Sequence, residues 1–270
     1  MSFHKIKSYA KINLTLNITG KNSLLHKIES IIMFTALHDE IFIKTIKSDN
    51  HDISFFGKFS QGINTKNTVT KLLNILENKE LLKDKKFRIK INKKIPIKAG
   101  LGGGSMNAAN ILKYLIKKKI VKVSKREISE ICKLIGSDVI LGLKSVNSIL
   151  TSKNKIKYFK NTQKFNILII RPNFGCNTKK IYSYVNKFNR PKLNKPNKKM
   201  FETEFLIKNN NFLESFAFSK YPKLKILKIY LEKELRPTFA RMTGSGSAIV
   251  AYFNSKKKCE NAKKKNYQEI

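Results

Sequence analysis

The segment PIKAGLGGGSMNAA, residues 96–109, decides how the rest of the chain is interpreted. It holds four glycines within residues 100–104, a density that is unfavourable inside a helix or a packed strand because glycine loses the most backbone freedom on folding. Such a loop lets the backbone wrap closely around an anion. A helix is predicted from Met106 to about Lys118, and its free N–H groups and positive dipole end would point into the loop. The segment therefore predicts a phosphate-binding loop.

Two common glycine-rich phosphate motifs do not fit this segment. The Gly-Lys-Ser/Thr ending of a Walker loop is missing. The glycine spacing also differs from that of a Rossmann fingerprint, and no acidic residue closes the next strand. The remaining alternative on local grounds is a flexible turn before a helix.

Strand and helix patterns alternate on both sides of the loop. Apolar residues alternate with polar ones in most strand candidates and recur at helical spacing in residues 67–82. After the loop, Ser124 with Glu127 forms a capping box, which predicts a helix that ends at Gly136. The remaining predicted strands are residues 5–18, 28–34, 40–46 (with His38-Asp39 in a turn before them), 87–91, 149–150 and 155–159.

The composition shifts near residue 155, which predicts two domains, residues 1–155 and 156–270. In the second domain, residues 187–199 are rich in Lys, Asn and Pro and predict a loop. RMTGSGS, residues 241–247, is a second glycine turn before a strand. The other predicted elements there are a strand at 165–171, helices at 212–218 and 224–235, a strand at 248–253, and a basic helix or tail at 256–265.

The formal net charge of +38 suggests a polyanionic partner such as nucleic acid. The lysines are spread along the whole chain, however, and only six of the 56 basic residues are arginine, the residue of bidentate phosphate and base contacts. Lys, Ile and Asn, which have A/T-rich codons, make up about two-fifths of the residues. Codon bias is therefore the simpler explanation of the charge, and nucleic-acid binding is the alternative.

Composition also excludes several classes of protein. A 41% hydrophobic content excludes a disordered polycation, and there is no apolar run of about 18 residues that could span a membrane. The N-terminal residues lack the apolar stretch of a signal peptide. The three cysteines are far apart and not at metal-binding spacing. We therefore expect a cytoplasmic protein without a membrane partner.

Three polar residues are candidates for chemistry, although each has an ordinary explanation on local grounds. Asp138 is the only carboxylate between residues 131 and 201, and it could be a base near the phosphate loop or a simple turn residue. Lys11 lies within an alternating strand, where a solvated lysine is the commoner case. His26 could be an ordinary surface residue. The sequence has no cluster of Cys and His residues that would indicate a zinc site.

Taken in order, these segments resemble the GHMP kinases, a family named for galactokinase, homoserine, mevalonate and phosphomevalonate kinases. The combination of an Ala-Lys-Ile-Asn strand with a Gly-Leu-Gly-Gly-Gly-Ser loop is specific to this family, whereas either alone is weak. The motifs that carry the resemblance are AKINLTLNITG (10–20), HKIESIIMF with HDE (26–34 and 38–40), the glycine loop (96–109), LIGSDV (134–139) and RMTGSGSA (241–248).

The resemblance implies a two-domain α+β fold, with an N-terminal ribosomal-protein-S5-like domain, a C-terminal ferredoxin-like domain and the active site in the cleft between them. It implies transfer of a phosphoryl group from ATP, with Mg²⁺ bound mainly through the nucleotide and no metal ligands among the side chains. Within the family, the match is best to enzymes whose substrate is a cytidine diphosphate sugar alcohol. We expect a monomer or homodimer.

The resemblance also assigns roles residue by residue. Lys11 and Asp138 match the catalytic pair, and His26 would hydrogen-bond the cytosine. Asn13, Thr178 and Tyr182 match other substrate positions, with Tyr182 stacking on the base. The ATP-binding segment corresponds to Pro96, Ile97, Lys98, Ala99, Gly100, Leu101, Gly102, Gly103, Gly104, Ser105, Met106 and Asn107.

The chain departs from the family pattern at several positions. Leu24-Leu25 stands where the family has Gly-Tyr, so one aromatic wall of the cytosine site is missing, and Met106 replaces a serine of the phosphate loop. Two alternatives within the family follow: a kinase of a smaller alcohol such as homoserine, or a kinase that has lost its activity. His26 and the Ala-Lys-Ile-Asn strand argue against the first.

Overall fold

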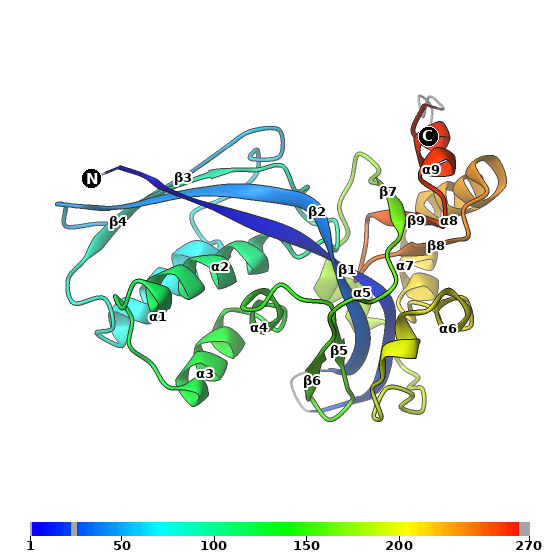
Figure 1. The fold of residues 1–270 in the computed structure, drawn as a ribbon, viewed down its shortest axis with the longest axis horizontal. Coiled ribbons are helices and arrows are strands. Elements are labelled where there is room, and N and C mark those ends of the chain that lie inside the picture. Colours follow the sequence, from blue (N-terminus) through cyan, green and yellow to red (C-terminus); the bar gives the residue numbers. More distant parts are fainter. Residues whose placement is uncertain (1, 23–25, 265–270) are drawn as a thin grey trace. The chain divides into compact units, whose positions relative to one another are not determined.

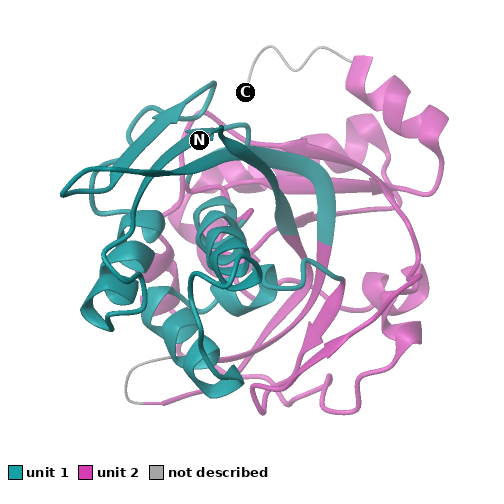
Figure 2. Ribbon diagram, turned by 60° about the vertical axis from the view of Figure 1, so that its left-hand side comes forward, with its two compact units in different colours: residues 1–11, 34–97, 102–146 teal, residues 12–33, 98–101, 147–270 magenta. Residues whose placement is uncertain are grey.

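The computed structural model describes residues 2–22 and 26–264 (Figure 1). The chain forms two compact units (Figure 2): unit 1 is residues 1–11, 34–97 and 102–146, and unit 2 is residues 12–33, 98–101 and 147–270. Strands β1 (His4–Lys21) and β2 (His26–Ile46) each contribute residues to both units. Because the units alternate along the chain, they do not correspond to a single cut at residue 155, and the domain boundary there stays a prediction.

Unit 1 contains a sheet built on the second half of β2. β4 (Lys86–Asn92) pairs antiparallel with β2, so that Ile41 lies opposite Ile91 and Ile43 opposite Ile89. β3 (Asp52–Phe56), which the sequence did not predict, runs parallel to β4. The turn predicted at His38-Asp39 is wrong, since β2 continues through both residues. Asp39 is tolerated inside the strand because its buried carboxylate accepts backbone N–H groups of Lys94 and Ile95.

Helices cover one face of this sheet (Figure 1). α1 (Thr68–Asn78) begins at Asn67, whose side chain accepts the N–H groups of Val69 and Thr70. α3 (Lys125–Ile135) has the predicted capping box and ends at Gly136, and α4 (Val139–Gly142) follows. α2 (Gly103–Lys117) begins three residues before the predicted Met106, so two glycines of the loop lie in its first turn. The core includes Leu72, Leu76, Ile89, Ile111, Leu112 and Ile131.

Unit 2 contains a three-stranded antiparallel sheet in the order β7–β9–β8. Its strands are β7 (Asn166–Ile170), β8 (Phe239–Met242) and β9 (Ile249–Phe253). The short strands β5 (Ser148–Leu150) and β6 (Ile156–Tyr158) extend the first half of β2. The helical elements are α5 (Thr178–Ser183), a 3₁₀ turn (Lys198–Phe201), α6 (Thr203–Ile207), α7 (Glu214–Lys220), α8 (Pro222–Tyr230), a π-helical turn (Leu231–Leu235) and α9 (Lys256–Lys264).

Candidate active site

The structure brings Lys11 and Asp138 together in unit 1. The Lys11 Nζ atom lies 3.0 Å from Asp138 Oδ2. The lysine side chain is 4% exposed and the aspartate side chain 31%, so the pair reaches solvent on the aspartate side. A buried ammonium group needs an opposite charge beside it, because desolvation alone disfavours the charged form. Asp138 provides this charge from the short connection between α3 and α4.

The glycine loop lies directly against Lys11. Gly102 has a φ of 70°, and a Cβ atom added there would lie 2.9 Å from Lys11 Cγ. Gly102 is also the N-cap of α2, and no side chain of the described residues caps this helix. The N–H groups of the first helical turn are therefore offered to an anion beside the Lys11–Asp138 pair.

The preceding part of the loop belongs to unit 2, where it contacts the second glycine turn. Gly100 has a φ of 75°, and a Cβ atom there would lie 2.0 Å from the Thr243 carbonyl oxygen. The Thr243 hydroxyl donates to the Gly100 carbonyl (3.3 Å) and accepts the backbone N–H of Asn13 (3.0 Å). The Asn13 side chain in turn donates to the Ser30 hydroxyl at 2.8 Å. The second glycine turn thus joins Gly100 to the β1 residue predicted to bind substrate.

A buried carboxylate fixes the chain just before the loop. Asp39 is 0% exposed and accepts hydrogen bonds from the backbone N–H groups of Lys94 and Ile95, both at 2.8 Å. It also accepts the Asn107 amide at 2.9 Å and pairs with the Lys93 ammonium. Burial lowers the pKa of Lys93, while the Asp39 charge opposes this shift. Asp39 therefore fixes the residues that precede the loop and also the first turns of α2. Asn107 contributes to this by donating its side-chain amide to Asp39.

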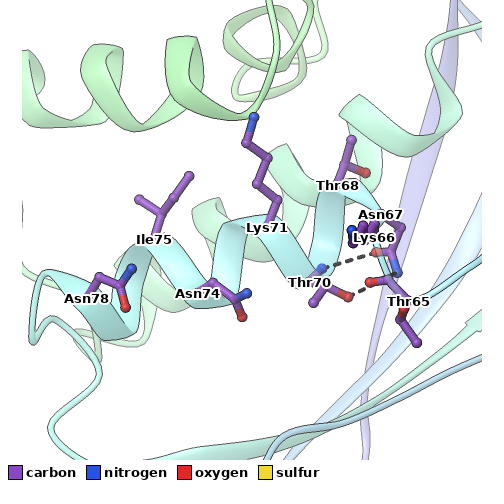
Figure 3. Close-up of a pocket in the computed structure, with 9 residues that line it drawn as sticks. All are labelled: Thr65, Lys66, Asn67, Thr68, Thr70, Lys71, Asn74, Ile75 and Asn78. Carbon is purple, nitrogen blue, oxygen red and sulfur yellow. Dashed lines mark hydrogen bonds between the residues drawn. The ribbon is translucent and has the colours of Figure 1, made fainter.

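Two further contacts define the start of α2. The Thr68 hydroxyl donates to the Gly104 carbonyl at 2.7 Å, which ties the loop to α1. Thr68 also lines a hollow of about 430 Å³ along α1 (Figure 3). Met106, by contrast, is fully buried, and a Cβ atom added to Gly142 would lie 3.0 Å from its sulfur. The Met106 side chain therefore belongs to the core under the loop.

The predicted substrate residues His26 and Tyr182 meet in unit 2, with ring centroids 5.2 Å apart and planes at 46°. The Nε2 atom of His26 is buried and has no hydrogen-bond partner among the described residues. Burial lowers the pKa of His26, as does the charge of Lys21, so both effects favour the neutral imidazole. Thr178 hydrogen-bonds the Ser245 hydroxyl of the second glycine turn at 2.7 Å. Leu24 and Leu25 lie outside the described residues.

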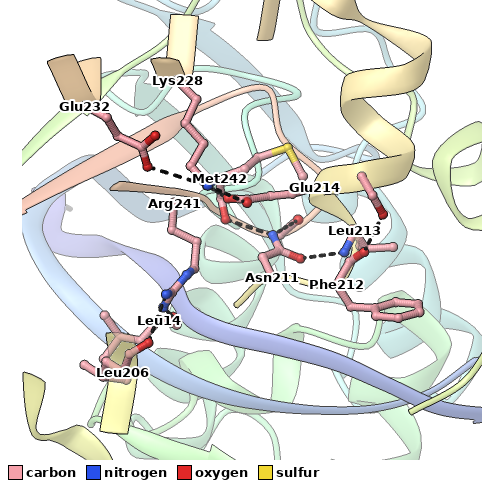
Figure 4. Close-up of polar contacts among 12 residues, drawn as sticks. Leu14, Leu206, Asn211, Phe212, Leu213, Glu214, Lys228, Glu232, Arg241 and Met242 are labelled. Carbon is pink, nitrogen blue, oxygen red and sulfur yellow. Dashed lines mark hydrogen bonds and ion pairs between the residues drawn. The ribbon is translucent and has the colours of Figure 1, made fainter. Parts of the chain in front are cut away.

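A buried polar network, which sequence analysis missed, supports the second glycine turn (Figure 4). Asn211 donates to the carbonyl groups of Met242 (2.8 Å) and Gly244 (2.7 Å). Glu214 accepts the Met242 N–H at 2.7 Å and the Lys228 ammonium at 2.8 Å. The asparagine lies in a polar run, residues 208–211, that is typical of a surface loop. Only its 1% exposure distinguishes it from its neighbours.

Neither a metal cluster nor a membrane span is found in the described part of the chain. No group of three or more His, Cys, Asp or Glu residues within residues 2–22 and 26–264 could hold a metal ion. In the same residues, no helix is long and apolar enough to cross a membrane.

Comparisons with known proteins identify the relatives of this chain. The family model described as GHMP kinases N terminal domain matches residues 67–148. The chain is 54% identical to the 4-diphosphocytidyl-2-C-methyl-D-erythritol kinase of Pelagibacter ubique, with 97% of this chain and 93% of the relative covered. It is 33% identical to the Petrotoga mobilis enzyme of the same name, with 92% and 99% covered.

Two solved structures show the fold. A crystal structure of 4-(cytidine 5'-diphospho)-2C-methyl-D-erythritol kinase has a TM-score of 0.75 at 22% identity, with 96% of this chain and 93% of that chain covered. A homoserine kinase from Cytophaga hutchinsonii has a TM-score of 0.67 at 16% identity, with 97% and 88% covered.

Replacement of Gly102 by alanine tests the loop geometry. We expect a loss of stability of about 1 kcal/mol, because an alanine in the left-handed region is strained, and at least a tenfold loss of ATP-dependent turnover, because the methyl group displaces Lys11. Gly62→Ala is the matched control, since Gly62 has a φ of 79° but a Cβ there would meet no atom closer than 3.7 Å. Equal activity of the two variants in a steady-state assay would contradict the proposed contact.

Replacement of Asn211 by leucine tests the support of the second glycine turn. The change leaves the Met242 and Gly244 carbonyl groups unpaired, so the free energy of unfolding in urea should fall by about 3 kcal/mol. Asn210→Leu is the control, because Asn210 is exposed. Similar unfolding midpoints for both variants would show that the buried amide does not hold the turn.

Proposed function

The chain belongs to the family of 4-diphosphocytidyl-2-C-methyl-D-erythritol kinases within the GHMP kinases, and we propose that it transfers the γ-phosphoryl group of ATP to the 2-hydroxyl of 4-diphosphocytidyl-2-C-methyl-D-erythritol. The family and its α+β fold were predicted from the sequence and are confirmed. The observation that carries the proposal is the Lys11–Asp138 ion pair, which lies against the glycine loop at the start of α2. The product is a precursor in non-mevalonate isoprenoid synthesis.

Asp138 and Lys11 would act on the acceptor hydroxyl. Asp138 is the partly exposed member of the pair, so a hydroxyl can reach its carboxylate, which would orient the hydroxyl or take its proton. Lys11 is held by the strand, the aspartate and Gly102, and its ammonium would stabilise negative charge on the transferring group. Positioning and charge stabilisation are the main contributions expected in phosphoryl transfer.

The ATP phosphates would lie in the loop, residues 96–107, where the backbone N–H groups of Gly103, Gly104 and Ser105 begin α2. Mg²⁺, when bound, would neutralise phosphate charge and would be held mainly by the nucleotide. Asn107 and Met106 would act by fixing the helix.

The cytosine would lie at His26 and Tyr182. A neutral imidazole whose buried Nε2 atom has no partner within residues 2–22 and 26–264 suits a hydrogen bond to the polar edge of a pyrimidine, and Tyr182 offers a ring for stacking. Asn13 and Thr178, which are both tied to the second glycine turn, would contact the rest of the substrate. The relatives favour this substrate over homoserine and over nucleic acid. A cytoplasmic location and a monomeric or homodimeric state stay predictions.

A coupled assay tests the function. Purified protein with ATP, Mg²⁺ and 4-diphosphocytidyl-2-C-methyl-D-erythritol should form ADP at about 1–100 turnovers per second, the range of many kinases. Homoserine and mevalonate serve as control acceptors and should give no ADP above the background rate. The assignment fails if the cytidyl substrate gives only background, or if a control acceptor reacts faster.

Asp138→Asn tests the catalytic pair. The variant should fold normally and lose at least a hundredfold in kcat, because an amide cannot take the hydroxyl proton. Asp84→Asn is the matched control, since Asp84 is an exposed carboxylate of the same unit. Steady-state kinetics and thermal unfolding are measured together, and near-normal turnover of Asp138→Asn would remove its catalytic role.

A further inference from the structure

A second aromatic ring lies beside His26. Phe188 has its ring centroid 6.4 Å from that of His26, with the planes at 54°. Phe188 is 47% exposed, although burial of a phenylalanine ring is normally favourable. Tyr182 lies on the same histidine, so two aromatic rings accompany the buried Nε2 atom.

The loop that carries Phe188 is fixed to β1 on the side of the next residue. The backbone N–H of Asn189 donates to the Ile18 carbonyl at 2.9 Å, and its side-chain amide donates to the Asn17 amide oxygen at 2.9 Å. The Asn17 amide donates in turn to the Arg190 carbonyl at 3.3 Å. Although the segment has no helix or strand, its position beside His26 is therefore defined by several hydrogen bonds.

A buried glutamate fixes the same loop to β2. Glu29 is 0% exposed and accepts the backbone N–H groups of Lys192 (2.7 Å) and Leu193 (3.0 Å), together with the Asn17 amide (2.9 Å). A buried carboxylate is costly unless its oxygens are hydrogen-bonded. Glu29 and His26 belong to the same strand, β2. The carboxylate therefore fixes the position of the loop relative to the histidine.

The Nε2 atom of His26 has no hydrogen-bond partner among the described residues. A buried polar atom without a partner is unfavourable, and a ligand with a polar edge would satisfy it. The surrounding rings suit a flat ligand. A pyrimidine base has both features, a polar edge and a face that stacks on aromatic side chains.

We propose that Phe188 forms an aromatic wall of the cytosine site in place of the tyrosine that the family has before His26, where this chain has Leu25. Glu29 is then a positioning residue, which acts on the base through Phe188. The inference rests on the proposed function, because the cytidyl group of the substrate supplies the base.

A tryptophan at position 188 tests stacking directly. The chain contains no tryptophan, so Phe188→Trp introduces a single tryptophan, which can be excited selectively over the nine tyrosines. Titration with cytidine 5'-diphosphate should quench its fluorescence, while ribose 5-phosphate should not. Phe56→Trp is the control, since Phe56 is a 45% exposed ring of β3 in unit 1. Absence of quenching at position 188, in a variant that turns over normally, would overturn the inference.

Kinetics test specificity. Phe188→Ala should raise KM for the cytidyl substrate about tenfold or more, the size of one base–aromatic stack, and leave KM for ATP unchanged. Phe188→Tyr should retain most of the affinity and Phe188→Leu should not. Glu29→Gln should also raise KM for the cytidyl substrate, and the double variant with Phe188→Ala should be no worse than Phe188→Ala alone. Independent, additive effects would reduce Glu29 to a structural residue and overturn its positioning role.

The experiments distinguish a failure of the proposed function from a failure of the inference about Phe188. If the wild-type protein turns over the cytidyl substrate and Phe188→Ala has an unchanged KM, the inference is wrong and the function stands. If the wild-type protein shows no turnover but tryptophan at 188 is quenched by cytidine diphosphate, the function is wrong and the pyrimidine site is supported.

Discussion

The ammonium group of Lys11 is buried inside a β-strand, and the site in unit 1 depends on how its charge is balanced. The partner has to be a carboxylate within direct reach, which requires α3 to end at Gly136 and α4 to begin directly after Asp138. The stem of the lysine needs room as well. Gly102 provides it, since a side chain there would meet Lys11 Cγ. The strand, the acid and the glycine are therefore mutually dependent, although they are distant in sequence.

In unit 2 the corresponding constraint is the second glycine turn, whose backbone polar groups are buried and have to be paired. Asn211 and Glu214 pair the carbonyl and N–H groups of this turn from one side. On the other side, Thr243 bonds the Gly100 carbonyl and the Asn13 N–H. The loop and the strand that carries Asn13 are thus positioned by this turn.

Local sequence patterns predicted helices correctly. They did not predict the features that depend on contacts between residues distant in sequence. The capping box at Ser124 and the helical spacing after residue 67 are local patterns, and the helices that they predict are confirmed. The turn predicted at His38-Asp39 is wrong because no local pattern shows that the backbone N–H groups of Lys94 and Ile95 return to pair with Asp39. The glycines at the start of α2 were excluded from the helix on propensity alone. The first turn tolerates them because its N–H groups have no intrahelical partner.

The roles of Lys11, Asp138 and His26 could be suggested only by family resemblance, since each has an ordinary explanation on local grounds. The structure adds a physical reason to examine each one: an ion pair for the first two and a buried, unpaired nitrogen for the third. Phe188 had no such signal, because it lies in a segment whose composition predicts a loop and nothing more. Its place beside His26 follows from hydrogen bonds to strands more than 150 residues earlier in the chain.

The strongly basic composition also has a structural consequence. With 56 basic residues and 18 acidic ones, most lysines have no carboxylate to pair with and lie in solvent. The buried carboxylates are used differently: Asp39, Glu29 and Glu214 each accept backbone N–H groups of a segment that leads to the site. A backbone donor is fixed in place, whereas a lysine side chain loses rotamer freedom when it is held. These few acids therefore order segments that lead to the site.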